Sequence, residues 1–297
     1  MTIKYLVTGA SGQLGALVID ALLARVPAEE IGALVRRSEA AAPLEAKGVS
    51  VRIASYDDAA ALETAFAGVE RLLLISSSEV GQRAAQHGRV IEAAKTAGVG
   101  FIAYTSILNA DSSPLKVLPV EHVATETALA ASGLSYALLR NGWYTENYVM
   151  GAGAALEHGA LIGAAGEGRI SSAARKDYAE AATAVLTGDL PESGTIYELA
   201  GDDSYTLAEF AAALSEAAGK TGDEGLGLAI SEFERIEETM GRIMSFAGLN
   251  YFSDTTDVAA AKFYGDAQGA VTDASSHLLF FPLELNRLDD KLVETCL

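Results

Sequence analysis

The chain has 297 residues, half of them hydrophobic and 21% charged, a balance that suits a globular protein with a sizeable core and excludes global disorder. Its 21 Lys and Arg residues are outnumbered by 40 Asp and Glu residues, and the formal net charge of −19 argues against a nucleic-acid-binding protein, which needs a basic face. Residues 1–150 carry 12 basic and 15 acidic side chains while residues 151–297 carry 9 and 25, so the first half can still bind an anionic ligand.

Apolar strands alternate with helices through the first half of the chain. We predict strands at 3–8, 31–35, 49–53, 71–76, 101–106 and 136–140, and helices at 14–25, 59–66, 82–97 and 119–131. Each strand is continuously apolar, which is typical of a parallel sheet that is covered on both faces. The sequence therefore predicts an α/β protein with a Rossmann-type, doubly wound parallel sheet.

This regular alternation ends after Asn141, where glycines become frequent. Beyond them we predict a helix at about 176–187, a strand at 195–199, a helix at 206–217, and helices joined by loops over the acidic residues 220–297. The change predicts a first domain at 1–150 and a smaller α/β region at 151–297, with the boundary near 145–160.

A glycine-rich turn joins the first predicted strand to the first predicted helix. Its residues, all expected to contact a dinucleotide, are Gly9, Ala10, Ser11, Gly12, Gln13, Leu14 and Gly15. Gly9 permits a tight turn, Gly12 lets a diphosphate approach the backbone, and Gly15 lets the helix pack closely on the strand. The N–H groups of the helix terminus then face the phosphates. The alternative is an ordinary glycine-rich turn between a strand and a helix.

Two arginines follow the second predicted strand, where an NAD site usually carries an acidic residue for the ribose hydroxyls. Arg36 and Arg37 instead suit a 2′-phosphate, because a guanidinium binds phosphate through paired N–H donors. We therefore expect NADPH rather than NADH, with Arg36 as the better candidate because it is nearer the strand end. The alternative is that both arginines are solvated surface charges.

Polar residues also follow the third and fourth predicted strands. Tyr56 and Asp57 are expected to flank the adenine, and the alternative is a helix N-cap at Asp57 or Asp58. The small residues Ser76, Ser77 and Ser78 leave room for the ribose and the diphosphate. The alternative for these serines is a simple polar loop.

The fifth predicted strand ends at Tyr104 and Ser106, which we expect to line the cofactor site. Short-chain dehydrogenases place a catalytic serine here and a Tyr-x-x-x-Lys motif on the following helix. This chain has His122 and Glu126 at about those two helical positions, so the usual carbonyl reductase mechanism and nucleotide-sugar epimerisation are not expected. His122 is a candidate proton donor. The alternative is a structural hydrogen bond between His122 and Glu126.

The sixth predicted strand leads into residues expected at the nicotinamide end of the site, because ligands gather at the carboxyl ends of parallel strands. Asn141 is a candidate for hydrogen bonding the carboxamide or a substrate oxygen. Trp143, Tyr144 and Tyr148 are candidates for stacking on a flat aromatic substrate. The alternative is that Trp143 belongs to the core.

Other features of the sequence exclude several kinds of site. The single cysteine, Cys296, cannot form an internal disulfide or a cysteine metal site, and we assign it no role. The histidines are scattered singly, so we expect no metal. No signal peptide pattern and no apolar run of about 18 residues is present, and we expect a cytoplasmic protein without a membrane span.

The chain resembles the NmrA-like branch of the atypical short-chain dehydrogenases, and within it the bacterial NADPH-dependent quinone reductases, with the triphenylmethane reductases nearby. The segments that carry the resemblance are 7–15, 72–83, 101–106, 138–147, 155–159 and 197–201. Together they cover roughly residues 3–216, and the chain departs from the family pattern from about residue 220 onward.

The resemblance implies a Rossmann-type amino-terminal domain that binds NADPH and a smaller carboxyl-terminal part that closes a cleft over it. It also implies two-electron reduction of quinones. Residues 9–15, Arg36, the loop Ser76–Ser78 and the segment Asn141–Tyr144 match cofactor and substrate positions of the family.

We therefore expect direct hydride transfer from NADPH to a small aromatic quinone, without a metal or a flavin. A quinone is a good hydride acceptor because its product is an aromatic hydroquinonate, which fits the missing Tyr-x-x-x-Lys motif. One alternative is an NADP(H)-binding redox sensor that regulates a partner without turnover, and another is a reductase of dyes or other aromatic acceptors. A homo-oligomer is compatible with each.

Overall fold

The computed structural model describes residues 3–113, 115, 117–163, 165–220 and 227–230. These residues form two compact units. Among them, the first unit takes residues up to 142 together with 174–200, and the second unit takes residues 143–173 and those from 201 onward.

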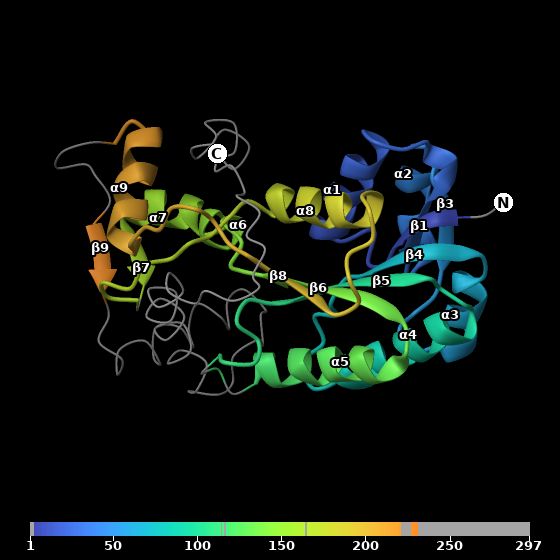
Figure 1. The fold of residues 1–297 in the computed structure, drawn as a ribbon. Helices are drawn as coiled ribbons and strands as arrows, with labels where there is room; N and C mark the ends of the chain where they lie inside the picture. The colour runs from blue at the N-terminus through green and yellow to red at the C-terminus, as the bar shows by residue number, and fades with distance from the viewer. Residues whose placement is uncertain (1–2, 114, 116, 164, 221–226, 231–297) are drawn as a thin grey trace. The chain divides into compact units, whose positions relative to one another are not determined.

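A seven-stranded parallel sheet forms the centre of the first unit (Figure 1). Its strands are β1 (Ile3–Val7), β2 (Ile31–Val35), β3 (Ser50–Ile53), β4 (Val69–Leu74), β5 (Phe101–Ile107), β6 (Ser135–Asn141) and β8 (Thr195–Leu199). They lie in the order β3-β2-β1-β4-β5-β6-β8, and each neighbouring pair is parallel. The strand order reverses at β1, between β2 and β4, and such a switch point is where Rossmann-type sheets bind their ligands.

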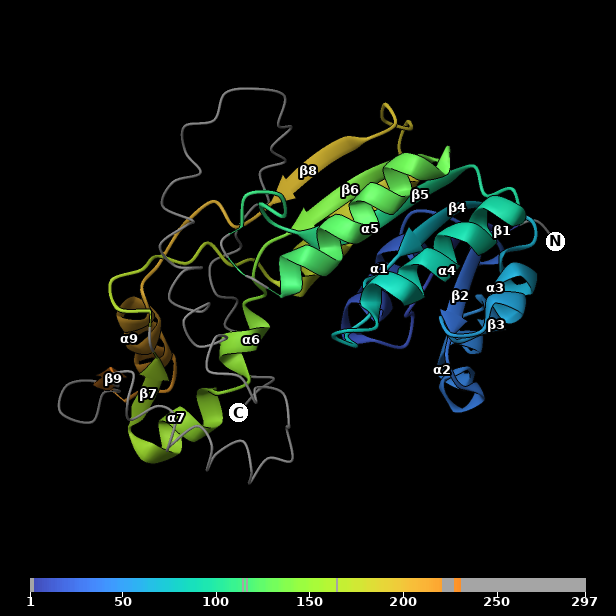
Figure 2. The ribbon, with the colours of Figure 1, turned by 90° about the horizontal axis from the view of Figure 1, so that it is seen from below.

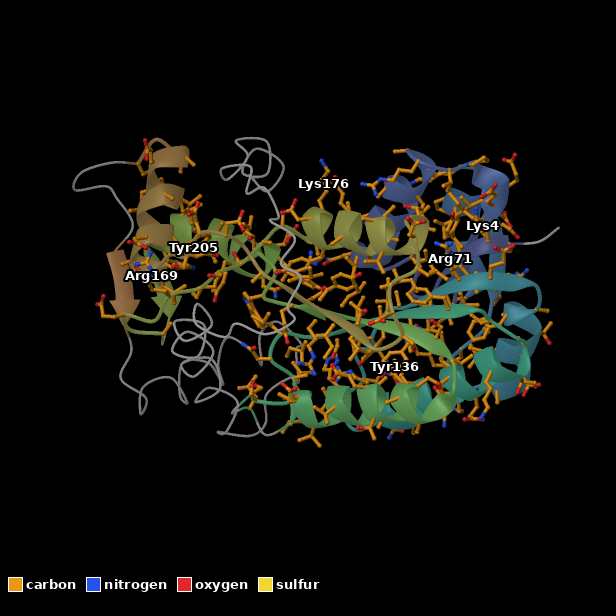
Figure 3. The ribbon with its side chains drawn as sticks, in the orientation of Figure 1. Lys4, Arg71, Tyr136, Arg169, Lys176 and Tyr205 are labelled. Carbon is orange, nitrogen blue, oxygen red and sulfur yellow. The ribbon has the colours of Figure 1, made fainter. Side chains whose placement is uncertain are left out.

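Helices cover both faces of this sheet (Figures 1 and 2). One face carries α1 (Gln13–Leu23) and α8 (Arg175–Thr187), and the other carries α3 (Ala59–Phe66), α4 (Arg83–Thr96) and α5 (Leu118–Ser132). The links between β1 and β3 add the short α2 (Ala42–Glu45) and two 3₁₀ turns, Ala28–Glu30 and Ser38–Ala40. Arg71 in β4 donates to the carbonyl oxygens of Leu186 and Gly188 at 2.6 and 2.8 Å, and this ties the end of α8 to the sheet (Figure 3).

The core between the sheet and helices α3, α4 and α5 explains why the strands are apolar throughout. Leu6, Leu72, Ile102 and Leu138 project from neighbouring strands onto residues such as Phe66, and all of these side chains are buried. Burying a side chain of this size contributes about 1.5–3 kcal/mol, so the continuous apolar runs hold the sheet between its two helical layers.

Local sequence signals set the helix ends. α5 starts with Pro119 in its first turn and ends at Gly133, which adopts φ +80°. Asp58 caps α3 by accepting from the N–H of Ala61 at 3.0 Å, and Gly68 follows the same helix at φ +72°. Proline lacks an N–H that the first turn does not use, and glycine adopts positive φ without strain.

The second unit consists of short elements around its own apolar cluster. They are α6 (Glu146–Val149), α7 (Ala152–His158), β7 (Ala160–Gly163), α9 (Leu207–Ala217) and β9 (Gly227–Ile230), with β7 and β9 paired in parallel. Thr206 and Glu209 form a capping box that starts α9. Arg169 pairs with Glu209 and hydrogen bonds Ser204, which fastens the segment before α9 (Figure 3).

The predicted fold class is confirmed, and the predicted strands and helices up to residue 217 are present with ends shifted by no more than two residues. The sequence did not predict the short elements α2, α6, α7 and β7. It predicted helices joined by loops over residues 220–297, but residues 227–230 form strand β9, so that prediction is wrong there. Residues 174–200 belong to the first unit, whereas the sequence analysis grouped everything after residue 150 together. The predictions for residues 231–297, including Cys296, lie outside the described residues. None of the described helices is long and apolar enough to cross a membrane.

Candidate functional site

The glycine turn lies at the carboxyl end of β1, at the switch point of the sheet. Gly9 adopts φ +59°, and its carbonyl accepts from the N–H of Gly12 at 2.9 Å. A Cβ on Gly15 would lie 2.3 Å from the carbonyl oxygen of Gly9, and a Cβ on Gly12 would lie 3.2 Å from the same atom. Glycine is thus required at residues 9 and 15 by the backbone itself, and the turn leaves a cradle that side chains would fill.

The amino terminus of α1 has the electrostatics of an anion site. Its N-cap residue is Gly12, which places no side-chain oxygen on the first N–H groups, and its first turn contains no acidic residue. The partial positive charge of the helix terminus is therefore not neutralised by the helix's own side chains. A diphosphate fits this terminus and the glycine cradle beside it.

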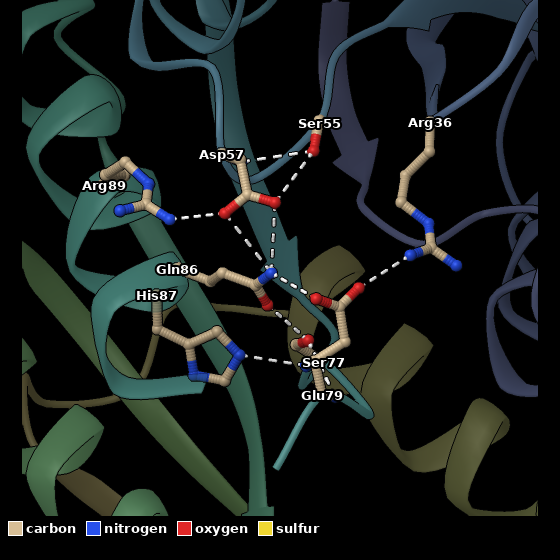
Figure 4. Close-up of polar contacts among 8 residues, drawn as sticks. All are labelled: Arg36, Ser55, Asp57, Ser77, Glu79, Gln86, His87 and Arg89. Atoms are coloured by element: carbon tan, nitrogen blue, oxygen red, sulfur yellow. Dashed lines mark hydrogen bonds and ion pairs between the residues drawn. The ribbon is translucent and has the colours of Figure 1, made fainter. Parts of the chain in front are cut away.

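Arg36 follows β2 and lies across the switch point from the loop after β4. Its Nη1 lies 3.0 Å from Oε1 of Glu79, and both side chains are exposed to solvent (Figure 4). Arg37 is also exposed. The guanidinium of Arg36 is thus held near the glycine turn by a carboxylate from the neighbouring loop, and its exposure leaves it accessible to a ligand phosphate.

Tyr56 and Asp57, which follow β3, have different surroundings. The hydroxyl of Tyr56 lies 2.9 Å from the carbonyl oxygen of Ile75 and hydrogen bonds with Thr8, so it joins the ends of three strands, and burial raises its pKa. Asp57 forms an ion pair with Arg89 of α4 at 2.5 Å (Figure 4). Asp58 rather than Asp57 caps α3, and the exposed carboxylate of Asp57 pairs with Arg89 instead.

The loop after β4 is fixed by hydrogen bonds from β5 and α4. The N–H of Ser76 donates to Oγ1 of Thr105 in β5 at 2.9 Å. The N–H of Ser77 donates to Nε2 of His87 at 2.9 Å (Figure 4). The carbonyl of Ser77 accepts from Nε of Arg83 at 2.7 Å. The simple polar loop that the sequence left open is therefore an ordered segment with a defined backbone path.

Sequence analysis did not identify the α4 side chains that hold this loop. Arg83, Gln86 and His87 are buried, and they continue the helix face that carries the apolar residues Val90 and Ile91. The positions 83, 86, 87, 90 and 91 follow helical spacing, so the signal was present in the sequence. Polar side chains on a face that is otherwise buried must find partners, and the backbone of the loop provides them.

His122 lies in buried surroundings that favour its neutral form. Its Nδ1 lies 2.7 Å from the hydroxyl of Tyr104, and burial, together with the nearby Arg83 and His87, lowers the pKa of His122 to about 3. The imidazole is therefore neutral near pH 7 and keeps a single N–H. The side chain of Tyr104 is 0% exposed, and its place in the cofactor site stays a prediction. No group of His, Cys, Asp and Glu side chains within the described ranges is arranged to hold a metal ion.

Glu126 pairs with an arginine and not with His122, so the alternative of a His122–Glu126 hydrogen bond is wrong. The carboxylate accepts from Nε and Nη2 of Arg140 at 3.0 and 2.7 Å and from Oγ of Ser106 at 2.5 Å. Arg140 also donates to Glu198 at 2.9 Å. Burial raises the pKa of Glu198 while Arg140 opposes the shift. Ser106 is buried within this cluster, and its place in the cofactor site stays a prediction.

Asn141 ends β6 at the predicted edge of the sheet. The side chain of Asn141 is buried. The backbone carbonyl of Asn141 accepts from the N–H of Leu108 at 2.9 Å. The next residue, Gly142, donates to the carbonyl of Leu199 at 2.7 Å, and a Cβ there would lie 3.0 Å from the same oxygen. The chain therefore leaves β6 in close contact with the end of β8, in line with the carboxyl ends of the other strands.

Trp143 and Tyr144 begin the second unit. Trp143 is 37% exposed, so the alternative of a core tryptophan is wrong. Its ring centroid lies 6.4 Å from that of Tyr148, which in turn packs at 5.7 Å on Phe210. Tyr144 pairs through its backbone with Ala173 and is half-buried. Trp143, Tyr148 and Phe210 thus form a series of aromatic contacts that begins at the exposed Trp143.

Comparisons with known proteins agree with the geometry of the glycine turn. A family model described as NAD(P)H-binding matches residues 9–189. Quinone oxidoreductase 2 of Escherichia coli is 58% identical over 214 residues, which are 72% of this chain and 74% of that protein. An NAD(P)H azoreductase of Xenophilus azovorans is 32% identical over 220 residues, again 72% of this chain and 74% of the relative.

Solved structures give the same result over most of the chain. An NADPH-dependent quinone oxidoreductase from Escherichia coli, complexed with NADPH, is similar with a TM-score of 0.80 and 48% identity over 92% of this chain and 93% of that chain. The triphenylmethane reductase of Citrobacter sp., complexed with NADP(H), is similar with a TM-score of 0.84 and 35% identity over 99% of this chain and 100% of that chain.

Proposed function

The chain belongs to the NAD(P)H-binding family whose model matches residues 9–189, and from this premise we propose that it catalyses the NADPH-dependent two-electron reduction of quinones. The observation that carries the proposal is the glycine turn at the switch point, with Arg36 exposed beside it, in a chain 58% identical to a quinone oxidoreductase. Gly9 allows the turn and Gly15 its close packing on α1, while Gly12, without a side chain, lets a diphosphate approach the backbone.

Each part of the site has a task in binding the nucleotide. The turn and the amino terminus of α1 hold the diphosphate, and Arg36 holds the 2′-phosphate through paired N–H donors. Tyr56 and Asp57 border the adenine, and the fixed loop Ser76–Ser78 borders the ribose. This placement makes NADPH the preferred nucleotide.

The acceptor end of the site positions the quinone and needs no ionised acid from the protein. NADPH supplies a hydride when it is bound. Asn141 orients the carboxamide or a substrate oxygen, and Trp143 and Tyr144 supply aromatic faces for the quinone ring. Water or the neutral imidazole of His122 supplies the proton to the hydroquinonate. The expected cytoplasmic location and a homo-oligomeric state remain predictions.

The test is NADPH oxidation by the purified protein with and without 1,4-benzoquinone, corrected for the uncatalysed reaction, with NADH in parallel. Rapid quinone-dependent loss of NADPH, with slower loss of NADH, is the expected result. Tight binding of NADP⁺ and NADPH without turnover on any quinone would refute the reductase and favour a redox sensor. Azo and triphenylmethane dyes belong in the acceptor panel, because relatives that reduce them share this fold.

A further inference from the structure

An ion pair joins the loops that follow the two strands on either side of β1. Nη1 of Arg36, after β2, lies 3.0 Å from Oε1 of Glu79, after β4, and the two side chains are 66% and 45% exposed (Figure 4). In the sheet, β1 lies between β2 and β4, and the turn Gly9–Gly15 follows β1. The pair therefore connects the loops that flank the proposed nucleotide turn.

Glu79 is held in this position by contacts that do not involve Arg36. Its Oε2 accepts from Nε2 of Gln86 at 2.9 Å, and its N–H donates to Oγ of Ser77 at 3.2 Å. Gln86 is itself buried, and its Oε1 accepts from Oγ of Ser77 at 2.5 Å. Because α4 anchors the carboxylate, Glu79 faces Arg36 without relying on an exposed ion pair, which by itself is weak.

We propose that Glu79 is a specificity-determining residue, an internal carboxylate that competes with the 2′-phosphate of NADPH for Arg36. The inference rests on the proposed function, which places that phosphate at Arg36. A guanidinium binds phosphate best through two parallel N–H donors, and Glu79 occupies Nη1. NADPH must therefore exchange one anion for another at Arg36, whereas NADH carries a hydroxyl at that place and leaves the pair intact.

Glu79 therefore weakens NADPH binding and leaves NADH binding unchanged, so it reduces the preference of the protein for NADPH over NADH. Exposed ion pairs of this kind correspond to about a two- to five-fold change in an equilibrium constant. Both partners are exposed, so the effect diminishes as salt screens the charges.

The test measures dissociation constants of NADPH and NADH by calorimetry, without any acceptor, for the unmodified protein and for Glu79→Gln. Glutamine keeps the size of the side chain and its acceptor for Gln86 but removes the charge. The NADPH Kd should fall about two- to five-fold at low salt, while the NADH Kd stays constant. Glu39→Gln is the matched control, because it removes an exposed carboxylate three residues after Arg36 and should change neither constant.

An unchanged or higher NADPH Kd in Glu79→Gln overturns the proposal, and so does an equal tightening of NADH or the same tightening in Glu39→Gln. When Arg36 is replaced by alanine, Glu79→Gln should change the NADPH Kd less than it does when Arg36 is present. An equal shift there means that Glu79 does not act through Arg36 and overturns the competition. Failure of the unmodified protein to bind NADPH contradicts the proposed function instead, so the two failures are distinguishable.

Discussion

A methyl group at Gly15 tests the close approach on which the nucleotide turn depends. In Gly15→Ala the new Cβ would lie 2.3 Å from the carbonyl oxygen of Gly9 and 2.8 Å from Cα of Ala10. Both neighbours are backbone atoms, so no side-chain rotation relieves the contact. Overpacking costs about 1–3 kcal/mol, and so short a contact belongs at the upper end. Alanine recovers about 0.5–1 kcal/mol of helix propensity, so the free energy of unfolding should fall by about 2 kcal/mol.

The matched control is a helical glycine with open space around it. A Cβ on Gly88, in α4, would meet no atom within 4 Å. Gly88→Ala therefore has only the propensity effect and should raise the free energy of unfolding by about 0.5–1 kcal/mol. Urea unfolding followed by circular dichroism gives the stability of both variants, and fluorescence quenching gives their NADPH Kd. Gly15→Ala should lose stability and nucleotide affinity together, while Gly88→Ala keeps its affinity.

Two results would refute this reasoning in different ways. If Gly15→Ala matches Gly88→Ala in urea midpoint, the close approach between α1 and the turn is wrong. If Gly15→Ala loses stability but binds NADPH with an unchanged Kd, the turn is close-packed but does not hold the diphosphate, and the assignment of the nucleotide site fails.

Three further predictions concern charge. Arg36→Ala should weaken NADPH about tenfold or more and NADH little, measured by calorimetry, and equal weakening would remove Arg36 from the 2′-phosphate. Arg140→Met should lower the free energy of unfolding by about 3–5 kcal/mol, because it leaves the carboxylates of Glu126 and Glu198 buried without their cation; an unchanged urea midpoint contradicts this. His122, with a pKa of about 3 against an ordinary 6.5, is protonated first in the unfolded chain, so stability should fall as the pH drops from 6.5 toward 3, by roughly 1.4 kcal/mol per pH unit. Burial and the nearby Arg83 also lower the pKa of His87 to about 3, so His87 contributes a similar slope; His122→Asn should reduce the slope without removing it, and an equal slope contradicts the assignment.

The parts of the fold that the sequence predicted are those governed by local signals. Continuous apolar runs such as residues 101–106 predict buried parallel strands, since only a sheet covered on both faces accepts them. Pro119 and Gly133 mark the ends of α5 because proline and glycine act on the backbone of their own turn. The glycine turn could be predicted for the same reason, because Gly9, Gly12 and Gly15 all act on the backbone of the same loop.

The parts of the site that the sequence did not predict depend on partners distant in the chain. Helical spacing puts His122 and Glu126 on one face, but it does not reveal that Arg140 lies on the neighbouring strand. The guanidinium offers Glu126 two charged donors, and a buried neutral imidazole offers at most one neutral donor, so the carboxylate pairs with Arg140. His122 is left with Tyr104, whose burial could not be inferred from its place at a strand end.

The surroundings of the arginines also show why Arg36 is the one suited to a ligand phosphate. Arg83 pairs with Glu121 and Arg140 pairs with Glu126, and in both pairs the guanidinium is buried. Breaking a buried pair costs about 3–5 kcal/mol, whereas an exposed pair such as that of Arg36 contributes about 0–1 kcal/mol. A phosphate can therefore replace the carboxylate at Arg36 at little cost, and neither buried arginine can move to take its place. In Arg36→Ala, therefore, neither Arg83 nor Arg140 should take the place of Arg36, and the preference for NADPH over NADH should not be restored.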